Sequence, residues 1–382
     1  MAHFAIPSHV LFGENALEEG KPYFKKLGRR ALIVTGPHVA KSPMLSKLKK
    51  TLEECEIPYY VFDGITGEPT DTMIGLGVQA CKKSASDFVI GIGGGSPIDS
   101  AKAIALMSCY EGSIADFMGK DINLKIPPIA AIPTTAGTGS EATKFTVITD
   151  SGTDIKMLLK GDCLIPELAI LNSAFTVDMP KSVTAATGLD ALTHAIEAYT
   201  SKKAFPLTDT YALSAVGRIM KYLPIAYKNG TDGEARKQML LAAFEAGICI
   251  NNSSVTLVHG MSRPIGALFH VPHGKSNAML LKECLDFAMD GALERFAKLG
   301  RSCQIVGKND RETAEGFLRA VEEVVKTCEI PTLLEFGIEK EDFIKAIPKM
   351  AEDAIASGSP GNTRKNVTKE DCMEIYKRVI AG

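Results

Sequence analysis

The stretch FVIGIGGGSPIDSAKAIAL, residues 88–106, decides the fold. An apolar run typical of a buried strand ends in three consecutive glycines, and helical periodicity follows. We expect Ser96 to cap this helix, Pro97 to take its first position and Asp99 to complete a capping-box-like pattern. Because a glycine-flanked helix N-terminus favours an anion, the segment predicts a pyrophosphate site. A tight β-to-α turn without ligand stays open, since the last glycine of the usual dinucleotide fingerprint is missing.

Strand and helix patterns alternate on both sides of this segment. From Ala31 to about Pro180, β-branched apolar runs alternate with amphipathic stretches, which predicts βαβ units and a mostly parallel sheet. Helical periodicity dominates after that point. We therefore expect an α/β nucleotide-binding domain over residues 1–179 and an all-α domain over residues 180–382, with a last helix capped by Thr368. The predicted strands are ALIVT (31–35), YYVF (59–62), FVIGI (88–92), PIAAIP (128–133), FTVITD (145–150) and LAILN (168–172), and the first predicted helices are MLSKLKKTLEEC (44–55) and DTMIGLGVQACKK (71–83).

Composition narrows the class of protein. The chain has 382 residues, a formal net charge of −2 and no long run of like charges, which disfavours a nucleic-acid footprint or a polybasic membrane anchor. No signal-peptide pattern opens the sequence, and no apolar run approaches the ~20 residues that span a bilayer. Nine scattered cysteines without a CxxC pair are typical of reduced thiols. We expect a cytoplasmic protein with small-molecule partners, no nucleic acid and no membrane.

A second loop, PTTAGTGSEAT at residues 133–143, also follows a predicted strand. It concentrates the hydroxyls of Thr134, Thr135 and Thr138 between glycines, a composition that can wrap a ribose or a nicotinamide amide. The alternative is a polar surface loop. Two such loops in one α/β domain favour a dinucleotide ligand.

Two later segments hold candidate metal ligands. In GLDALTHAIEAY, Asp190 and His194 are four residues apart and project from one helix face. In VHGMSRPIGALFHVPHGKS, His259 lies in a helical stretch interrupted by Pro264, and His273 lies in a Pro-His-Gly turn. Four of the seven histidines fall in these two segments, which favours a shared ion over independent core histidines or a surface Asp–His pair.

These motifs together resemble the iron-containing alcohol dehydrogenases, a family that shares a superfamily with glycerol dehydrogenase and dehydroquinate synthase. The segments GGGSPID, PTTAGTGSEAT, GLDALTHAIEAY and HGMSRPIGALFHVPHG match in order and span almost the whole chain. The resemblance implies a Rossmann-like N-terminal domain, a helical C-terminal domain, and NAD(P) with one divalent ion, Fe²⁺ or Zn²⁺. The ligands it implies are Asp190, His194, His259 and His273.

The resemblance also implies cofactor contacts that the residues alone do not. Lys156 by itself reads as a solvated charge, and Phe145, placed near the aldehyde pocket by the resemblance, reads as a core aromatic. The implied cofactor contacts are Gly36, Gly94, Gly95, Ser96, Asp99, Thr134, Thr135, Thr138, Ser140, Val147 and Lys156.

Two positions depart from the family pattern. Gly36 replaces the Asp that members strict for NAD tend to carry, so NADP is not repelled, and His38 or Lys41 can approach a 2′-phosphate. We expect NAD, with NADP as a possible second cofactor. Arg263 replaces a further His that is often given a proton-transfer role. An arginine suits an anionic head group, although an ion pair with a carboxylate of the same domain is the alternative.

The expected activity is a metal-dependent alcohol dehydrogenase, or aldehyde reductase, acting on a small aldehyde such as sulfoacetaldehyde, phosphonoacetaldehyde or succinic semialdehyde. His270 is a candidate proton relay, with a surface or supporting role as the alternative. Neutral substrates of the lactaldehyde, 1,3-propanediol or butanol type stay open, as does a non-catalytic nucleotide-binding protein. The family implies a homo-oligomer, a dimer or larger.

Overall fold

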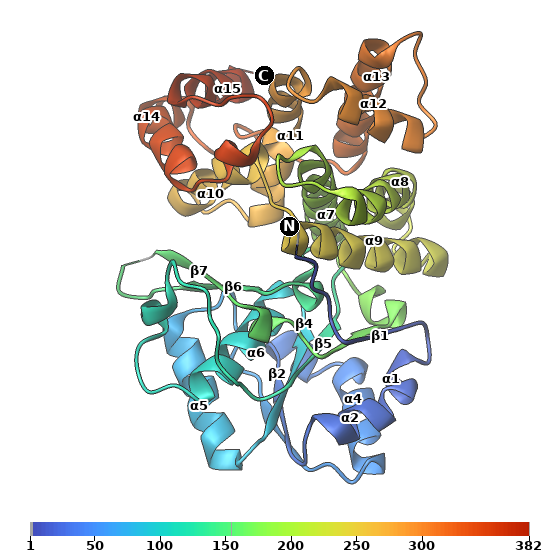
Figure 1. The fold of residues 1–382 in the computed structure, drawn as a ribbon, viewed down its shortest axis with the longest axis vertical. Helices are drawn as coiled ribbons and strands as arrows, with labels where there is room; N and C mark the ends of the chain where they lie inside the picture. Colours follow the sequence, from blue (N-terminus) through green and yellow to red (C-terminus); the bar gives the residue numbers. More distant parts are fainter. Residues whose placement is uncertain (1–2, 154, 382) are drawn as a thin grey trace. The chain divides into compact units, whose positions relative to one another are not determined.

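The computed structural model describes residues 3–153 and 155–381, which divide into two compact units (Figure 1). One unit spans Phe4–Asp178, and the other begins at Met179. The first carries all the described strands, and the second is helical. The predicted fold class, a parallel α/β domain followed by an all-α domain, is confirmed.

A six-stranded sheet in the order β1-β8-β5-β4-β2-β3 forms the centre of the first unit, with every neighbouring pair parallel. The inner strands are buried on both faces, as expected for continuous apolar runs in a parallel sheet. In β2, Ile33 packs in one hydrophobic cluster and its neighbours Leu32 and Val34 in another, so helices cover both faces. The strands are β1 (His9–Phe12), β2 (Ala31–Val34), β3 (Tyr59–Phe62), β4 (Phe88–Gly93), β5 (Ile129–Pro133) and β8 (Leu168–Leu171).

Six α-helices accompany this sheet in the described part of the unit. Phe24 and Leu48 pack with Ile33, whereas Ile74 and Ile104 pack with Val34, which places α2 and α4 on one face and α5 and α6 on the other (Figure 1). The helices are α1 (Ala16–Glu19), α2 (Lys21–Leu27), α3 (Pro37–Ala40), α4 (Pro43–Glu54), α5 (Asp71–Ser84) and α6 (Gly95–Ser108).

Three strands differ from the expectation. The edge strand β1 was not predicted, because its residues are mostly exposed and show no buried apolar run. The FTVITD segment is a strand, but not of the parallel sheet: β6 (Phe145–Thr149) pairs antiparallel with β7 (Lys156–Lys160), which was not predicted. Every second residue of β6 is buried, which is the pattern of a half-covered hairpin.

The topology brings the two glycine-rich loops together. Strands β4 and β5 are parallel neighbours, with Gly93 opposite Pro133 at their carboxyl ends. Each glycine-rich segment follows one of these ends. Ligands of open α/β sheets generally bind at this edge, and both loops lie there.

The second unit is a helical assembly around α7, whose residues from Gly188 to Thr200 are all buried. The predicted cap of the last helix is present, because Thr368 Oγ1 accepts from the backbone N–H of Asp371 and the Asp371 carboxylate accepts from Thr368 N–H. The helices are α7 (Lys181–Thr200), α8 (Pro206–Lys228), α9 (Gly233–Asn252), α10 (Leu257–Phe269), α11 (His273–Met289), α12 (Leu293–Ser302), α13 (Asp310–Thr327), α14 (Lys340–Ala356) and α15 (Lys369–Ala381).

Within residues 3–153 and 155–381, no single helix combines the length and the apolar composition of a membrane span. The α9 and α10 pair reaches the threshold only when taken together, and it is bent by 101°.

Candidate functional site

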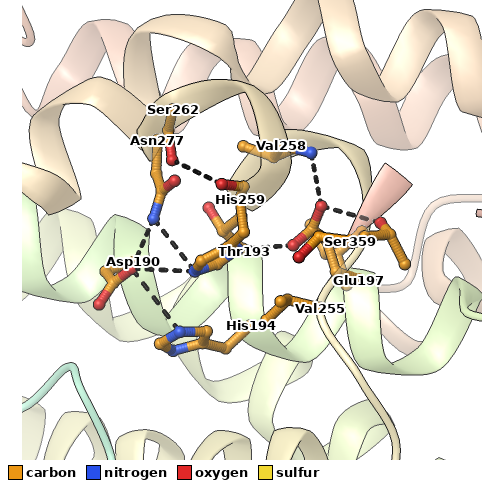
Figure 2. A network of polar contacts seen from close by, with 12 residues as sticks. Asp190, Thr193, His194, Glu197, Val255, Val258, His259, Ser262, Asn277 and Ser359 are labelled. Atoms are coloured by element: carbon orange, nitrogen blue, oxygen red, sulfur yellow. Dashed lines mark hydrogen bonds and ion pairs between the residues drawn. The ribbon is translucent and has the colours of Figure 1, made fainter. Parts of the chain in front are cut away.

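Three helices of the second unit bring the predicted metal ligands together. Asp190 and His194 lie one turn apart on α7, which follows from their spacing of four residues. His259 lies in the first turn of α10, and His273 is the first residue of α11. Figure 2 shows Asp190, His194 and His259 directed toward a common point.

Two local expectations about these segments need correction. Helix α10 is not interrupted at Pro264 but continues to Phe269, since Pro264 lies well inside it. His273 is not in a turn but begins α11, with Pro272 as the N-cap residue. A rigid helix rather than a loop therefore carries each of these histidines.

The distances between the ligand atoms fit a single cation. Asp190 Oδ1 lies 3.6 Å from Nε2 of His259, 3.6 Å from Nε2 of His273 and 3.8 Å from Nε2 of His194. These separations are too long for hydrogen bonds, yet ligands about 2.1 Å from a tetrahedral ion stand about 3.4 Å apart. Ligand atoms of Asp190, His259 and His273 all lie within 4.8 Å of one another. One carboxylate with imidazoles suits Fe²⁺ or Zn²⁺.

The surroundings keep the Asp190 carboxylate ionised. Burial alone would raise the pKa of Asp190, but the imidazoles of His194 and His273 hold that pKa below its usual range. Asp190 and His259 are buried, whereas the His273 side chain is 42% exposed. The cluster therefore presents a buried negative charge with one side open, as a site that admits an ion and a substrate requires.

Two residues next to the cluster were not predicted from the sequence. Glu197 Oε2 lies 2.6 Å from His259 Nδ1, and Asn277 Nδ2 donates to Asp190 Oδ1 at 2.7 Å. Asn277 Nδ2 also lies 3.2 Å from Nε2 of His259 and of His273. Helical periodicity could have pointed to Glu197, since it is seven residues after Asp190 on the same helix face. Asn277 has no such signal in the sequence apart from its place one turn after His273.

Arg263 lies one turn after His259 on α10 and is partly buried. Its Nη1 donates to Ser359 Oγ at 3.3 Å, and among the described residues no carboxylate lies within ion-pair distance of its guanidinium. Burial lowers the pKa of Arg263 while the charge of Glu197 raises it, and an arginine remains cationic in either case. The alternative of an ion pair within the helical unit is therefore not realised in the described residues.

His270 ends α10 with a left-handed backbone (φ 55°) and an exposed side chain. Among the contacts of the described residues, none joins it to the four candidate ligands. The structure thus places it at the solvent side of the segment that leads to His273.

In the first unit, the two glycine-rich loops pack against each other. A Cβ on Gly94 would lie 3.3 Å from Thr135 Cγ2, and one on Gly95 would lie 2.9 Å from Thr138 Cγ2. Only glycine permits this approach at Gly95 without displacing the second loop. The hydroxyls of Thr135 and Thr138 therefore stand directly beside the start of α6.

The start of α6 differs from the predicted cap. Gly94 is the N-cap residue and Gly95 the first helical residue, with no side-chain cap, so Ser96 lies inside the first turn. Asp99 does not form a capping box, because its Oδ2 accepts from the backbone N–H of Val147 at 3.0 Å. The uncapped N–H groups of this first turn stay available for an anion.

Buried charges connect α6 to the second loop. Lys102 Nζ donates to the carbonyl oxygens of Thr143 at 2.7 Å and Phe145 at 2.8 Å. Burial lowers the pKa of Lys102 to about 8. The negative charges of Asp99 and Glu141 raise this pKa but offset only part of the effect of burial. Lys102 therefore fixes the segment between the second loop and β6 onto α6.

The remaining predicted cofactor residues lie on the same unit. A Cβ on Gly36 would meet the backbone oxygen of Ile65 at 2.7 Å, so close packing requires glycine there. Thr134 and Ser140 are buried in the second loop. The hairpin residues Phe145, Val147 and Lys156 are partly or largely exposed, and Lys156 Nζ pairs with Glu68 at 2.8 Å.

Known proteins match this chain along nearly its full length. Residues 7–173 match the family described as iron-containing alcohol dehydrogenase, and residues 184–380 match the C-terminal region of the Fe-containing alcohol dehydrogenase family. Alcohol dehydrogenase 4 of Schizosaccharomyces pombe is 38% identical, covering 94% of this chain and 85% of its own length. The NADPH-dependent butanol dehydrogenase of Clostridium saccharobutylicum is 33% identical, covering 100% and 99%.

Solved structures agree with these matches. A 1,3-propanediol oxidoreductase superposes with a TM-score of 0.95 at 32% identity, covering 99% of this chain and 100% of the other. The sulfoacetaldehyde reductase from Bifidobacterium kashiwanohense, in complex with NAD⁺, superposes with a TM-score of 0.90 at 26% identity, covering 100% and 99%.

Proposed function

This chain belongs to the iron-containing alcohol dehydrogenase family, and from that premise we propose that it reduces a small aldehyde with an anionic head group. The general activity is that of an NAD(P)-dependent alcohol dehydrogenase that works with a divalent ion. Sulfoacetaldehyde, phosphonoacetaldehyde and succinic semialdehyde are the substrate types that fit. The preference for an anion is the specific part of the proposal.

The observation that carries this preference is Arg263. It lies one turn from His259, and among the described residues its guanidinium has only the neutral hydroxyl of Ser359 as a side-chain hydrogen-bond partner. A partly buried cation without a paired carboxylate favours an anionic ligand, because burying an unpaired charge is costly. A relative that reduces sulfoacetaldehyde shares the fold, which supports such a substrate class.

The chain's own residues divide the work as follows. Asp190 and the three imidazoles hold the divalent ion, and Arg263 orients the head group of the aldehyde. When bound, the ion acts as a Lewis acid on the carbonyl oxygen, and NAD(P)H supplies the hydride. The hydroxyl-rich loop with Thr135 and Thr138 binds the nicotinamide half of the dinucleotide, and the first turn of α6 binds its pyrophosphate.

For the cofactor we infer NAD, with NADP accepted. Gly36 offers no carboxylate to repel a 2′-phosphate. A side chain at position 36 would meet the backbone oxygen of Ile65, so an acidic residue could not stand there without a backbone shift. Named relatives include an NADPH-dependent enzyme and one solved with NAD⁺. Rates measured with NADH and NADPH on one aldehyde test this, and a strong preference for NADPH contradicts it.

The test compares kcat/KM of wild type and Arg263→Ala on sulfoacetaldehyde, succinic semialdehyde and butyraldehyde. We expect the variant to lose roughly 10- to 100-fold on the two anionic aldehydes, since hydrogen bonds to charged groups contribute about 1.5–3 kcal/mol. The rate on butyraldehyde should change far less.

Arg319→Ala is the matched control, because Arg319 is an exposed arginine on α13 of the same unit. It should leave all three rates near wild type. An equal loss on charged and neutral aldehydes in Arg263→Ala would contradict the anionic substrate and favour a neutral one of the butanol or propanediol type.

A further inference from the structure

We propose that Glu197 is a positioning residue that holds His259 in the tautomer whose Nε2 lone pair faces Asp190, and so sets the affinity of the site for its divalent ion. The inference rests on the proposed role of His259 as a metal ligand. It adds a residue of α7 that does not itself contact the ion.

Glu197 is fully buried, and both of its oxygens are occupied. Oε1 accepts from the backbone N–H of Val258 at 2.6 Å and from Thr256 Oγ1 at 2.8 Å. Oε2 lies 2.6 Å from His259 Nδ1. Figure 2 shows Glu197 on the side of His259 opposite Asp190. The carboxylate therefore contacts the imidazole at Nδ1, on the side away from Asp190, and both of its oxygens are already engaged by other groups.

The direction of these hydrogen bonds fixes the tautomer. A backbone N–H can only donate, so Glu197 acts as an acceptor toward Val258, and an ionised carboxylate has no proton of its own to give. His259 Nδ1 must then carry the proton. Nε2 is left with its lone pair, and it points toward Asp190 Oδ1 at 3.6 Å. Histidines that bind metals are commonly oriented by such a carboxylate.

The same carboxylate also fixes where His259 stands. Thr256, the N-cap residue of α10, makes no side-chain cap to its own helix, and its hydroxyl instead bonds Glu197. Val258 lies in the first turn of that helix. Glu197 thus ties the start of α10 to α7, the helix that carries Asp190 and His194. A change at Glu197 affects both the proton on His259 and the spacing between ligands from two helices.

The experiment measures the dissociation constant for Co²⁺ by competition with a chelator, together with the visible spectrum of the bound ion, in wild type and Glu197→Gln. We expect affinity to fall by about 10- to 100-fold, the usual loss when such a partner is changed. The Co²⁺ bands should shift, because the imidazole is no longer held in one tautomer. Circular dichroism checks that the variant is folded.

Two controls separate positioning from simple loss of a buried acid or of a helix contact. Glu245→Gln removes another largely buried carboxylate, bonded to Ser214 on α8, and should keep wild-type Co²⁺ affinity. Thr256→Val removes one Glu197 contact but leaves the bond to His259, and should lose much less affinity than Glu197→Gln.

Wild-type affinity and spectrum in Glu197→Gln would overturn the proposal, as would an equal loss in Thr256→Val, since the carboxylate would then only cap α10. Failure of the wild-type protein itself to bind Co²⁺ would instead overturn the metal site on which the inference rests. If Glu197→Gln fails to fold, Glu197→Asp keeps the charge but shortens the side chain and draws it away from His259 Nδ1. This variant should lose more Co²⁺ affinity than Thr256→Val, and wild-type affinity in it would overturn the proposal.

Discussion

Glu141 is a buried acid of the first unit that lies outside the predicted cofactor contacts. It sits in the hydroxyl-rich loop, fully buried, and within the described residues its Oε1 has no hydrogen-bond partner. Burial raises the pKa of Glu141 to about 7, and the nearby charge of Lys102 opposes only part of that rise. The loop therefore holds an acid that the fold prefers protonated.

Glu141→Gln tests this through stability against pH. Because the folded pKa lies above the unfolded value of 4.5, the wild type loses stability as pH rises from about 4.5 through 7. Gln pays no such cost, so its advantage should grow from near zero at pH 4.5 to at most about 3 kcal/mol at pH 8. Urea unfolding at several pH values measures it. A difference between the two proteins that does not depend on pH would contradict the shifted pKa.

Among single residues, those with a periodic signature could be predicted from the sequence. Asp190 and His194 stand one helical turn apart, and helical spacing predicts that both project from one face, although the prediction of a shared ion also needed His259 and His273. Glu197 lies on the same helix face, but the sequence alone does not distinguish it from a solvent-facing acid, because its partners Val258 and His259 lie on α10. The Asn277 contact with Asp190 joins residues 87 positions apart, which no local pattern reveals.

At the scale of elements, the two glycine-rich loops work as one structure. Gly95→Ala would place a Cβ 2.9 Å from Thr138 Cγ2 and 3.1 Å from its Oγ1, so Thr138 of the second loop must shift. We expect KM for NADH to rise several-fold with a smaller change in kcat, because the pocket for the dinucleotide widens while the helical unit is untouched. Steady-state kinetics measures this.

Gly75→Ala on α5 is a matched control for that change, since a Cβ there meets nothing within 4 Å. It should leave KM for NADH at the wild-type value. An unchanged KM in Gly95→Ala would mean that the contact between the loops does not shape the cofactor site.

Elements with a strong apolar signal could also be predicted, and those held by distant partners could not. The buried strands β2, β4, β5 and β8 fall where continuous apolar runs indicate them. The exposed edge strand β1 gains its hydrogen bonds from β8, more than 150 residues later in the chain. The first turn of α6 needs no side-chain cap, so the Ser-Pro-x-Asp pattern misplaced its start by two residues.

For the whole molecule, the two units carry separate parts of the chemistry. The parallel sheet of the first presents the two loops that we propose bind the dinucleotide, and the helices of the second bring together an aspartate and three histidines from distant segments. The sequence indicated this division through the change from alternating patterns to helical periodicity. In the proposed function the choice of substrate depends on fewer residues, chiefly Arg263, so helix and strand patterns in the sequence predict the substrate less well.

The most direct test of the central claim is the metal content of the purified protein after reconstitution with Fe²⁺ or Zn²⁺, measured by elemental mass spectrometry. Wild type should hold one divalent ion per chain, and the double variant Asp190→Asn, His273→Ala should hold essentially none while keeping its helical circular dichroism. A folded double variant that retains the full ion content and reduces aldehydes at the wild-type rate would contradict the account.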